Sequence, residues 1–126
     1  MPEKPVQLSA TERRIVRTAI VEVCRHEGWL LYGLHVRSTH VHAVVQSPVA
    51  PKNVIGKYKA YASRALNARF GFRKRRWARH GSTRRLWSPL EVDAALHYVV
   101  HQQGEPMEVY ELVDRWSVVL GRVPHP

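Results

Sequence analysis

Two apolar segments with a very short joint between them constrain the fold of this chain most. The segments are WLLYGLHVR, residues 29–37, and HVHAVVQS, residues 40–47, and only Ser38 and Thr39 separate them. Both are rich in large apolar and β-branched residues, as strands are, and so short a joint connects antiparallel neighbours only. The sequence therefore predicts a β-hairpin at this place.

Helices are predicted on both sides of this hairpin. Ser9 and Glu12 form a capping box ahead of an amphipathic helix that ends at Gly28. A second helix is predicted over about residues 52–69. Its outward residues include Lys57, Tyr61 and Arg64, and its inner stripe consists of Ile55, Tyr58, Ala62, Ala65 and Leu66.

A third helix is predicted from Ser88 and Pro89 to a point before Gly104. Its buried stripe consists of Val92, Leu96, Val99 and Val100. Weaker patterns indicate an edge strand in PVQL, residues 5–8, a second hairpin within residues 70–88, and a short helix followed by a tail after Gly104.

The order of these elements predicts the α+β class, with an antiparallel β-sheet and helices packed against it. A chain of 126 residues suits one domain with one core. We expect residues 1–105 to form this domain and residues 106–126 to be a C-terminal extension that packs on it or trails from it. The single Cys24 is expected to be a core residue.

Charge is distributed very unevenly along the chain. The net charge is +10, yet all ten acidic residues lie at positions 3–27 or 91–114, and residues 28–90 hold thirteen Lys and Arg. Such a cationic middle favours nucleic acid as the partner, with aromatic side chains available to stack on bases. A solvated basic face and a charge-attracted membrane surface are the alternatives. Without a signal peptide or an apolar run of roughly 18 residues, we expect a soluble cytoplasmic protein associated with the nucleoid.

Two histidines project from the second strand of the predicted hairpin. Residues i and i+2 of a strand point to the same side, so His40 and His42 lie side by side and can share one divalent metal ion. The alternative is a pair of strand histidines whose nitrogens are satisfied by neighbouring groups. The His-x-His pattern alone does not decide between the two.

A tyrosine and a glutamine lie one helical turn apart on the third predicted helix. Tyr98 and Gln102 are at positions i and i+4, beside the apolar stripe. An amide oxygen can bind a hard cation, and a phenol held next to a metal can attack phosphorus. Gln103 and His101 compete with Gln102 as ligand, and Tyr58 and Tyr61 compete with Tyr98 as nucleophile.

Taken together, these motifs resemble those of a known family. His-Val-His at 40–42, YVVHQ at 98–102, YKAYASRALN at 58–67 and RHGSTRRLW at 79–87 are similar to the HUH single-tyrosine transposases, in particular to small REP-associated tyrosine transposases. The resemblance covers roughly residues 10–105 and implies an HUH endonuclease fold with a ferredoxin-like or RRM-like arrangement. Many relatives have Asn where this chain has Thr39.

The resemblance also implies a mechanism and a set of functional residues. His40, His42 and Gln102 would bind Mg²⁺ or Mn²⁺, and Tyr98 would cleave single-stranded, hairpin-forming DNA through a 5′-phosphotyrosine link. The site would be built within one chain or shared across a homodimer. The expected DNA-binding residues are basic or aromatic and come from the cationic middle: Lys57, Lys59, Tyr61, Arg64, Arg73, Lys74, Arg75, Arg76, Arg79 and Arg84.

Two other functions are compatible with the same residues. A non-catalytic, domesticated domain would bind single-stranded nucleic acid without cutting it. A structural zinc domain would tie strand to helix through a metal, but such sites usually use cysteine, and this chain has one.

Overall fold

The computed structural model describes residues 7–73, 75–77, 86, 88–102 and 104–112. These residues form three helices, α1 (Ala10–Glu27), α2 (Pro51–Phe70) and α3 (Pro89–His101), and three strands, β1 (Leu30–Val36), β2 (Val41–Gln46) and β3 (Glu108–Glu111). The strands make one antiparallel sheet in the order β2-β1-β3. The α+β class and the hairpin predicted from the sequence are confirmed.

Local sequence signals explain where α1 begins and ends. The Ser9 hydroxyl accepts the Glu12 amide, and the Glu12 carboxylate accepts the Ser9 amide at 2.9 Å, which is the predicted capping box. Gly28 ends the helix with a φ of 74°, a left-handed conformation that glycine adopts without a Cβ clash. Cys24 is buried in the core on this helix, as predicted.

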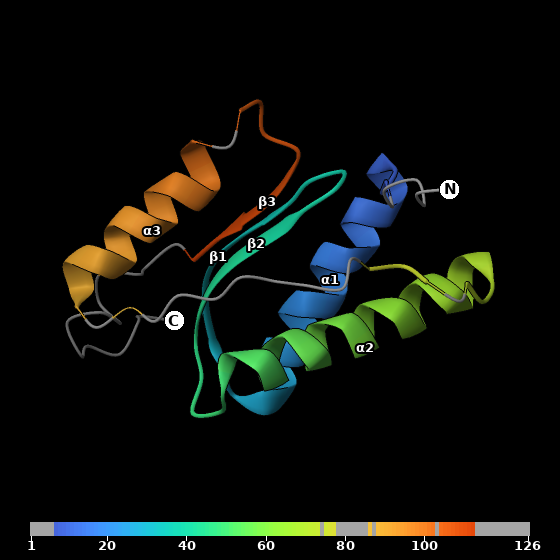
Figure 1. Cartoon of the computed structure of the whole chain (residues 1–126), viewed down its shortest axis with the longest axis horizontal. Coiled ribbons are helices and arrows are strands. Elements are labelled where there is room, and N and C mark those ends of the chain that lie inside the picture. The colour runs from blue at the N-terminus through green and yellow to red at the C-terminus, as the bar shows by residue number, and fades with distance from the viewer. Residues whose placement is uncertain (1–6, 74, 78–85, 87, 103, 113–126) are drawn as a thin grey trace, which may run out of the picture.

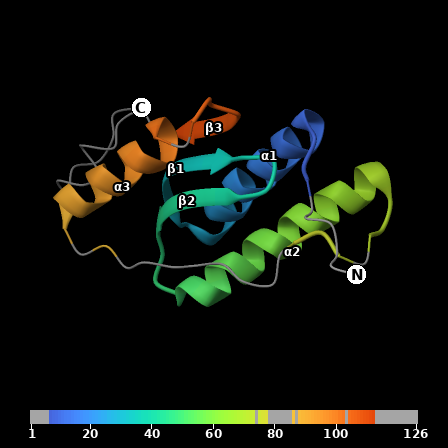
Figure 2. The same ribbon diagram turned by 45° about the horizontal axis from the view of Figure 1, so that its top comes forward.

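The sheet lies between two helical layers (Figures 1 and 2). Helix α3 covers one face of the sheet and α1 covers the other, with α2 packed along α1. The α3 side of the core consists of Tyr32, Val44, Leu96, Val99 and Val100. The α1 side is larger and includes Leu34, Val36, Val16, Ile20, Tyr58 and Leu66.

An irregularity in β1 brings α3 very close to the sheet. The pairing with β2 shifts between Leu31 and Gly33, so one residue of β1 has no partner there. A Cβ added to Gly33 would lie 2.2 Å from Cδ1 of Leu96 and 3.3 Å from Cγ2 of Val100. Only glycine leaves room for Leu96 at this position, so Gly33 sets the distance between β1 and α3.

The C-terminal part differs from the sequence prediction. A short helix was expected after Gly104, but residues 108–111 form β3, which pairs with β1 from Gly33 to Val36. This pairing is long-range, and the alternation of a four-residue strand is too short to indicate it. Residues 113–126 and residues 5–6 of the predicted edge strand lie outside the described residues. The domain boundary at residue 105 stays a prediction.

The second hairpin predicted within residues 70–88 falls largely on residues 78–85, which lie outside the described residues. Residues 71–73 and 75–77 are described, and none of them is in a strand.

We predict that Gly33→Ala destabilises the protein. The new methyl group would force Leu96 out of its position, which typically costs about 1–3 kcal/mol in a packed core. Gly56→Ala is the matched control, because Gly56 lies inside α2 with no atom within 4 Å of an added Cβ. This control should be stabilised by about 0.5–1 kcal/mol. Urea unfolding followed by circular dichroism measures both, and equal effects of the two variants would contradict the close approach.

Candidate active site

His40 and His42 lie side by side at the start of β2. Their ring centroids are 6.0 Å apart and their planes differ by 15°. His40 is exposed, and His42 is partly buried. Val44, two residues after His42, packs in the α3 cluster, so the histidines are on the face of the sheet that α3 covers.

Each histidine has surroundings that suit a metal ligand. The Nδ1 of His40 is 2.8 Å from Oγ1 of Thr39, which leaves Nε2 available. Metal-binding histidines usually make such a contact through their second nitrogen, and Thr39 supplies it here. Burial lowers the pKa of His42, and the nearby charges of His40 and Arg37 lower it further. A lowered pKa keeps this imidazole neutral, which is the form that binds metals.

The last turn of α3 is attached to the sheet next to this pair. His35 of β1 is directly opposite His42 in the strand register. Its Nδ1 is 3.0 Å from the carbonyl oxygen of Val99, and its Nε2 is 3.0 Å from the amide of Met107. The carboxyl end of α3 therefore lies over the strand pair that carries the histidines.

Tyr98 and Gln102 occupy one flank of α3. The amide of Gln102 donates to the carbonyl of Tyr98 at 3.1 Å, so the two residues lie one turn apart. His101, the residue before Gln102, has its Nε2 3.8 Å from a carboxylate oxygen of Glu111 on β3. Strands β2 and β3 lie on opposite sides of β1, and Gln102 is about 100° of helical rotation from His101.

Within the described residues, no group of three or more His, Cys, Asp or Glu side chains is placed to hold a metal ion. Among the described residues, a third ligand for the histidine pair would therefore be of another kind. An amide oxygen fits this requirement, because two imidazoles and an oxygen form a donor set suited to divalent ions. Gln102, the C-cap of α3, is an amide next to the turn that His35 attaches to β1.

The rival tyrosines lie in different surroundings. Tyr58 is 8% exposed, and its hydroxyl is 3.3 Å from Sγ of Cys24. Burial, with a smaller contribution from Cys24, raises the pKa of the Tyr58 hydroxyl far above its ordinary value. Tyr58 is a core residue, as its place in the inner stripe predicted. Tyr61 is partly buried, with the guanidinium of Arg64 4.6 Å from its ring centroid. Tyr98 is 54% exposed.

Most of the predicted DNA-binding residues within the described range are at the surface. Lys57 is exposed and pairs with Glu27 at 2.5 Å, a contact that lowers the pKa of that carboxyl. Arg64, Arg73 and Arg75 are exposed, and Lys59 is partly buried. Lys74, Arg79 and Arg84 lie outside the described residues.

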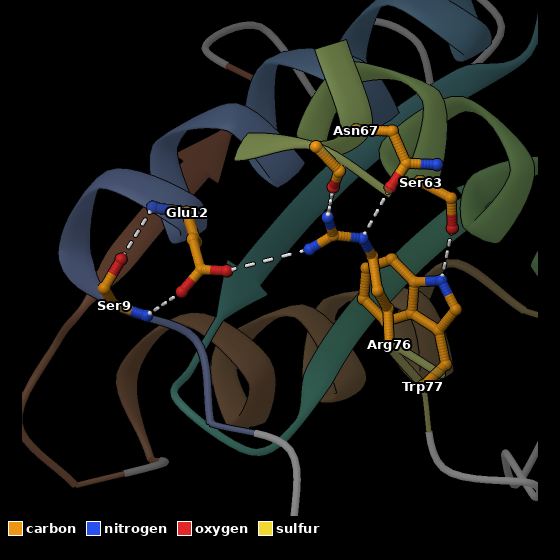
Figure 3. Close-up of polar contacts among 7 residues, drawn as sticks. Ser9, Glu12, Ser63, Asn67, Arg76 and Trp77 are labelled. Carbon is orange, nitrogen blue, oxygen red and sulfur yellow. Dashed lines mark hydrogen bonds and ion pairs between the residues drawn. The ribbon is translucent and has the colours of Figure 1, made fainter. Parts of the chain in front are cut away.

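Arg76 has a different role from the one that the basic run RKRR suggested. It is 5% exposed. Figure 3 shows its guanidinium between two helices: Nε donates to the side chain of Asn67 at 2.9 Å and Nη2 to the carbonyl of Gly71 at 2.8 Å. Its Nη1 is 3.9 Å from the carboxylate of Glu12. The guanidinium is thus engaged inside the protein, and we do not include Arg76 in the DNA-binding surface.

Two exposed phenylalanines at the end of α2 were missed by the sequence analysis. Phe70 is 49% and Phe72 is 81% exposed, and the guanidinium of Arg69 is 5.8 Å from the Phe70 ring centroid. Their position outside the inner stripe of α2, beside arginines, was a signal that could have found them.

The family of the chain follows from a comparison with family models. The model described as transposase IS200-like matches residues 4–89. The chain belongs to the IS200-like transposase family. Searches of curated proteins and of solved structures found no significant match. A transposase acts on DNA, which agrees with the cationic middle of the chain, and no described helix is long and apolar enough to cross a membrane.

The family match includes the histidine pair, the hairpin and α2, but it ends at the first residue of α3. Tyr98 and Gln102 therefore depend on the resemblance of YVVHQ and on the geometry of α3. The roles of these two residues are proposals.

We predict that Arg76→Gln destabilises this transposase by about 1–3 kcal/mol, because it leaves the partly buried carboxylate of Glu12 and the carbonyl of Gly71 without their guanidinium partner. Exposed Arg73→Gln is the control and should change the free energy of unfolding by less than about 0.5 kcal/mol. Chemical unfolding measures both. An Arg76→Gln variant of unchanged stability that binds DNA more weakly would instead make Arg76 a DNA contact.

Proposed function

We propose that this IS200-like transposase cleaves and rejoins single-stranded, hairpin-forming DNA through a 5′-phosphotyrosine intermediate. The nucleophile is Tyr98, and His40, His42 and Gln102 bind a divalent metal, Mg²⁺ or Mn²⁺. The observation that supports this proposal is the attachment of the last turn of α3 to β1 by His35, which is opposite His42 in the sheet. We propose that the flank of Tyr98 and Gln102 faces the histidine pair.

The proposed DNA cleavage uses the half-exposed phenol of Tyr98 as the nucleophile. The bound metal would polarise the scissile phosphate and offset charge in the transition state. The hydroxyl oxygen of Tyr98 attacks phosphorus and its proton passes to solvent. The bond from phosphorus to the 3′ oxygen breaks, and that oxygen takes a proton from solvent to become a 3′-OH. Attack of a 3′-OH on the phosphotyrosine reverses the step, so no nucleotide cofactor is needed to rejoin the strands.

We also propose that the site is built within one chain. Helix α3 is held on its own sheet by the Leu96 contact with Gly33, by His35 at Val99 and by His101 beside Glu111. To reach a partner's histidines, α3 would have to give up all these contacts. A homodimer in which each chain uses its own Tyr98 is compatible with this arrangement.

The DNA-binding surface in this proposal lies on α2 and the segment that follows it. Strand β2 is at the edge of the sheet and lies between α2 and α3 (Figure 2). A strand of DNA that crosses this edge would reach from the cationic surface of α2 to the flank of Tyr98. The side chains proposed to contact it are Lys57, Lys59, Tyr61, Arg64, Phe70, Phe72, Arg73, Lys74, Arg75, Arg79 and Arg84.

One observation favours a second function. The family match stops before Tyr98, so it supports the histidine strand and the basic helix but not the nucleophile. A domesticated relative that binds single-stranded nucleic acid without cutting it would have the same match.

We predict that Tyr98→Phe abolishes covalent attachment to DNA without weakening binding. The test incubates the protein with labelled single-stranded hairpin DNA and Mg²⁺ or Mn²⁺, and then detects a denaturation-resistant adduct. Tyr61→Phe is the matched control and should keep the adduct. His42→Ala should also remove the adduct, together with Mn²⁺ binding, while much of the salt-sensitive DNA binding remains.

Undiminished adduct in Tyr98→Phe would assign the nucleophile to another tyrosine. If the wild-type protein forms no adduct with either metal on any hairpin, the binding domain is the correct function.

We predict that Phe72→Ala and Arg73→Gln weaken DNA binding in different ways. Phe72→Ala should remove one stacked base, which should weaken the free energy of DNA binding by about 1–3 kcal/mol and leave its salt dependence unchanged. Loss of one phosphate contact should reduce the salt slope by about one. Leu90→Ala is the control, since Leu90 is 78% exposed but lies on α3. Fluorescence anisotropy across a salt series measures both effects, and equal losses in Phe72→Ala and Leu90→Ala would contradict stacking at Phe72.

A further inference from the structure

We propose that His35 is a positioning residue that fixes the nucleophile helix over the metal-binding histidines. This inference depends on the proposed function, because it concerns the placement of Tyr98 and Gln102 relative to His40 and His42. The family resemblance assigns no role to His35, and the evidence for one is its contacts.

His35 is completely buried, and both of its ring nitrogens have a partner. Nε2 is 3.0 Å from the backbone amide of Met107 and must accept that hydrogen. Nδ1 is 3.0 Å from the carbonyl oxygen of Val99 and must therefore be the donor. The two backbone partners thus specify a neutral imidazole with its hydrogen on Nδ1.

The two contacts act on different parts of the molecule. Val99 is in the last turn of α3, where carbonyl groups have no amide donor within the helix. The N–H of His35 on the sheet donates to the Val99 carbonyl instead. Met107 belongs to the segment that connects α3 to β3. One side chain of β1 therefore holds both the end of α3 and the chain that leaves it.

The bond to Val99 is the one that concerns the site. Val99 follows Tyr98 directly, and Gln102 is tied to Tyr98 by a backbone hydrogen bond. His35 is itself paired with His42 in the register of the sheet. An apolar residue of similar size could fill this space, but it would fix neither the rotation nor the sliding of α3 along β1. A directional bond does fix them, which is what a nucleophile and a ligand on the same helix require.

Two conservative variants separate the two contacts. The amide nitrogen of asparagine can take the place of Nδ1 as a donor, so His35→Asn should keep the bond to Val99 and lose the bond to Met107. The amide of glutamine extends to the place of Nε2, so His35→Gln should keep the bond to Met107 and lose the bond to Val99.

The experiment compares these two variants with the wild type. The single-turnover rate of adduct formation, per folded molecule, should fall by about 10–100-fold in His35→Gln and by less than about threefold in His35→Asn. DNA affinity should be unchanged in both. Amide hydrogen exchange, measured without metal or DNA, should be faster in the last turn of α3 in His35→Gln than in His35→Asn, because only the former loses the Val99 contact.

The results that would overturn the inference are distinct. If His35→Gln and His35→Asn lose stability alike but keep the wild-type rate per folded molecule, His35 is only a structural residue. If His35→Asn folds and loses the rate as strongly as His35→Gln, the Val99 bond is not the contact that matters. If His35→Gln does not fold, the test depends on His35→Asn alone. A wild-type rate of adduct formation and wild-type hydrogen-exchange protection of the last turn of α3 in His35→Asn support the inference, and loss of both overturns it. If the wild-type protein forms no adduct, the proposed function fails, and this inference fails with it.

Discussion

Strand β1 is buried on both faces, and the positions of the other elements depend on it. Its side chains pack against α1 on one face and against α3 on the other, while β2 and β3 pair with its two edges. A strand so enclosed must be almost wholly apolar, and from Leu31 to Val36 every residue is buried. Burial of this one strand brings segments that are distant in the sequence to a single sheet.

The candidate site is a consequence of that arrangement. His40 and His42 follow the turn at the end of β1. Helix α3 reaches the same end of the sheet because Leu96 packs closely on Gly33 of β1 and the carbonyl of Val99 contacts His35 of β1. Near the end of α3, His101 is also 3.8 Å from Glu111 of β3. Strand β2, which carries His42, lies between α2 and α3 (Figure 2).

Much of this could be predicted from the sequence, because its signals are local. The capping box at Ser9, the glycine that ends α1, the Ser-Pro start of α3 and the two-residue joint of the hairpin each act within a few residues. The spacing of His40 and His42 in a strand likewise fixes their common side. The strand at residues 108–111 could not be predicted, since its reason to form lies in the free edge of β1, about seventy residues earlier in the chain. The close approach at Gly33 depends on Leu96 for the same reason.

Among the described residues, two polar side chains are buried, and the sequence around them does not indicate their roles. His35 and Arg76 occur in an apolar strand and in a basic run, and neither context indicates a partner. In each case the partners include a backbone group outside helices and strands: the amide of Met107 for His35 and the carbonyl of Gly71 for Arg76. A buried polar group is stable only when its hydrogen bonds are made. Arrangements of the neighbouring backbone that break the hydrogen bonds of His35 or Arg76 are therefore higher in free energy. Apolar packing brings the helices to the sheet, and these two residues determine how the connecting segments leave the helices. One of those segments leads out of the proposed nucleophile helix, and the other leads out of the helix proposed to bind DNA.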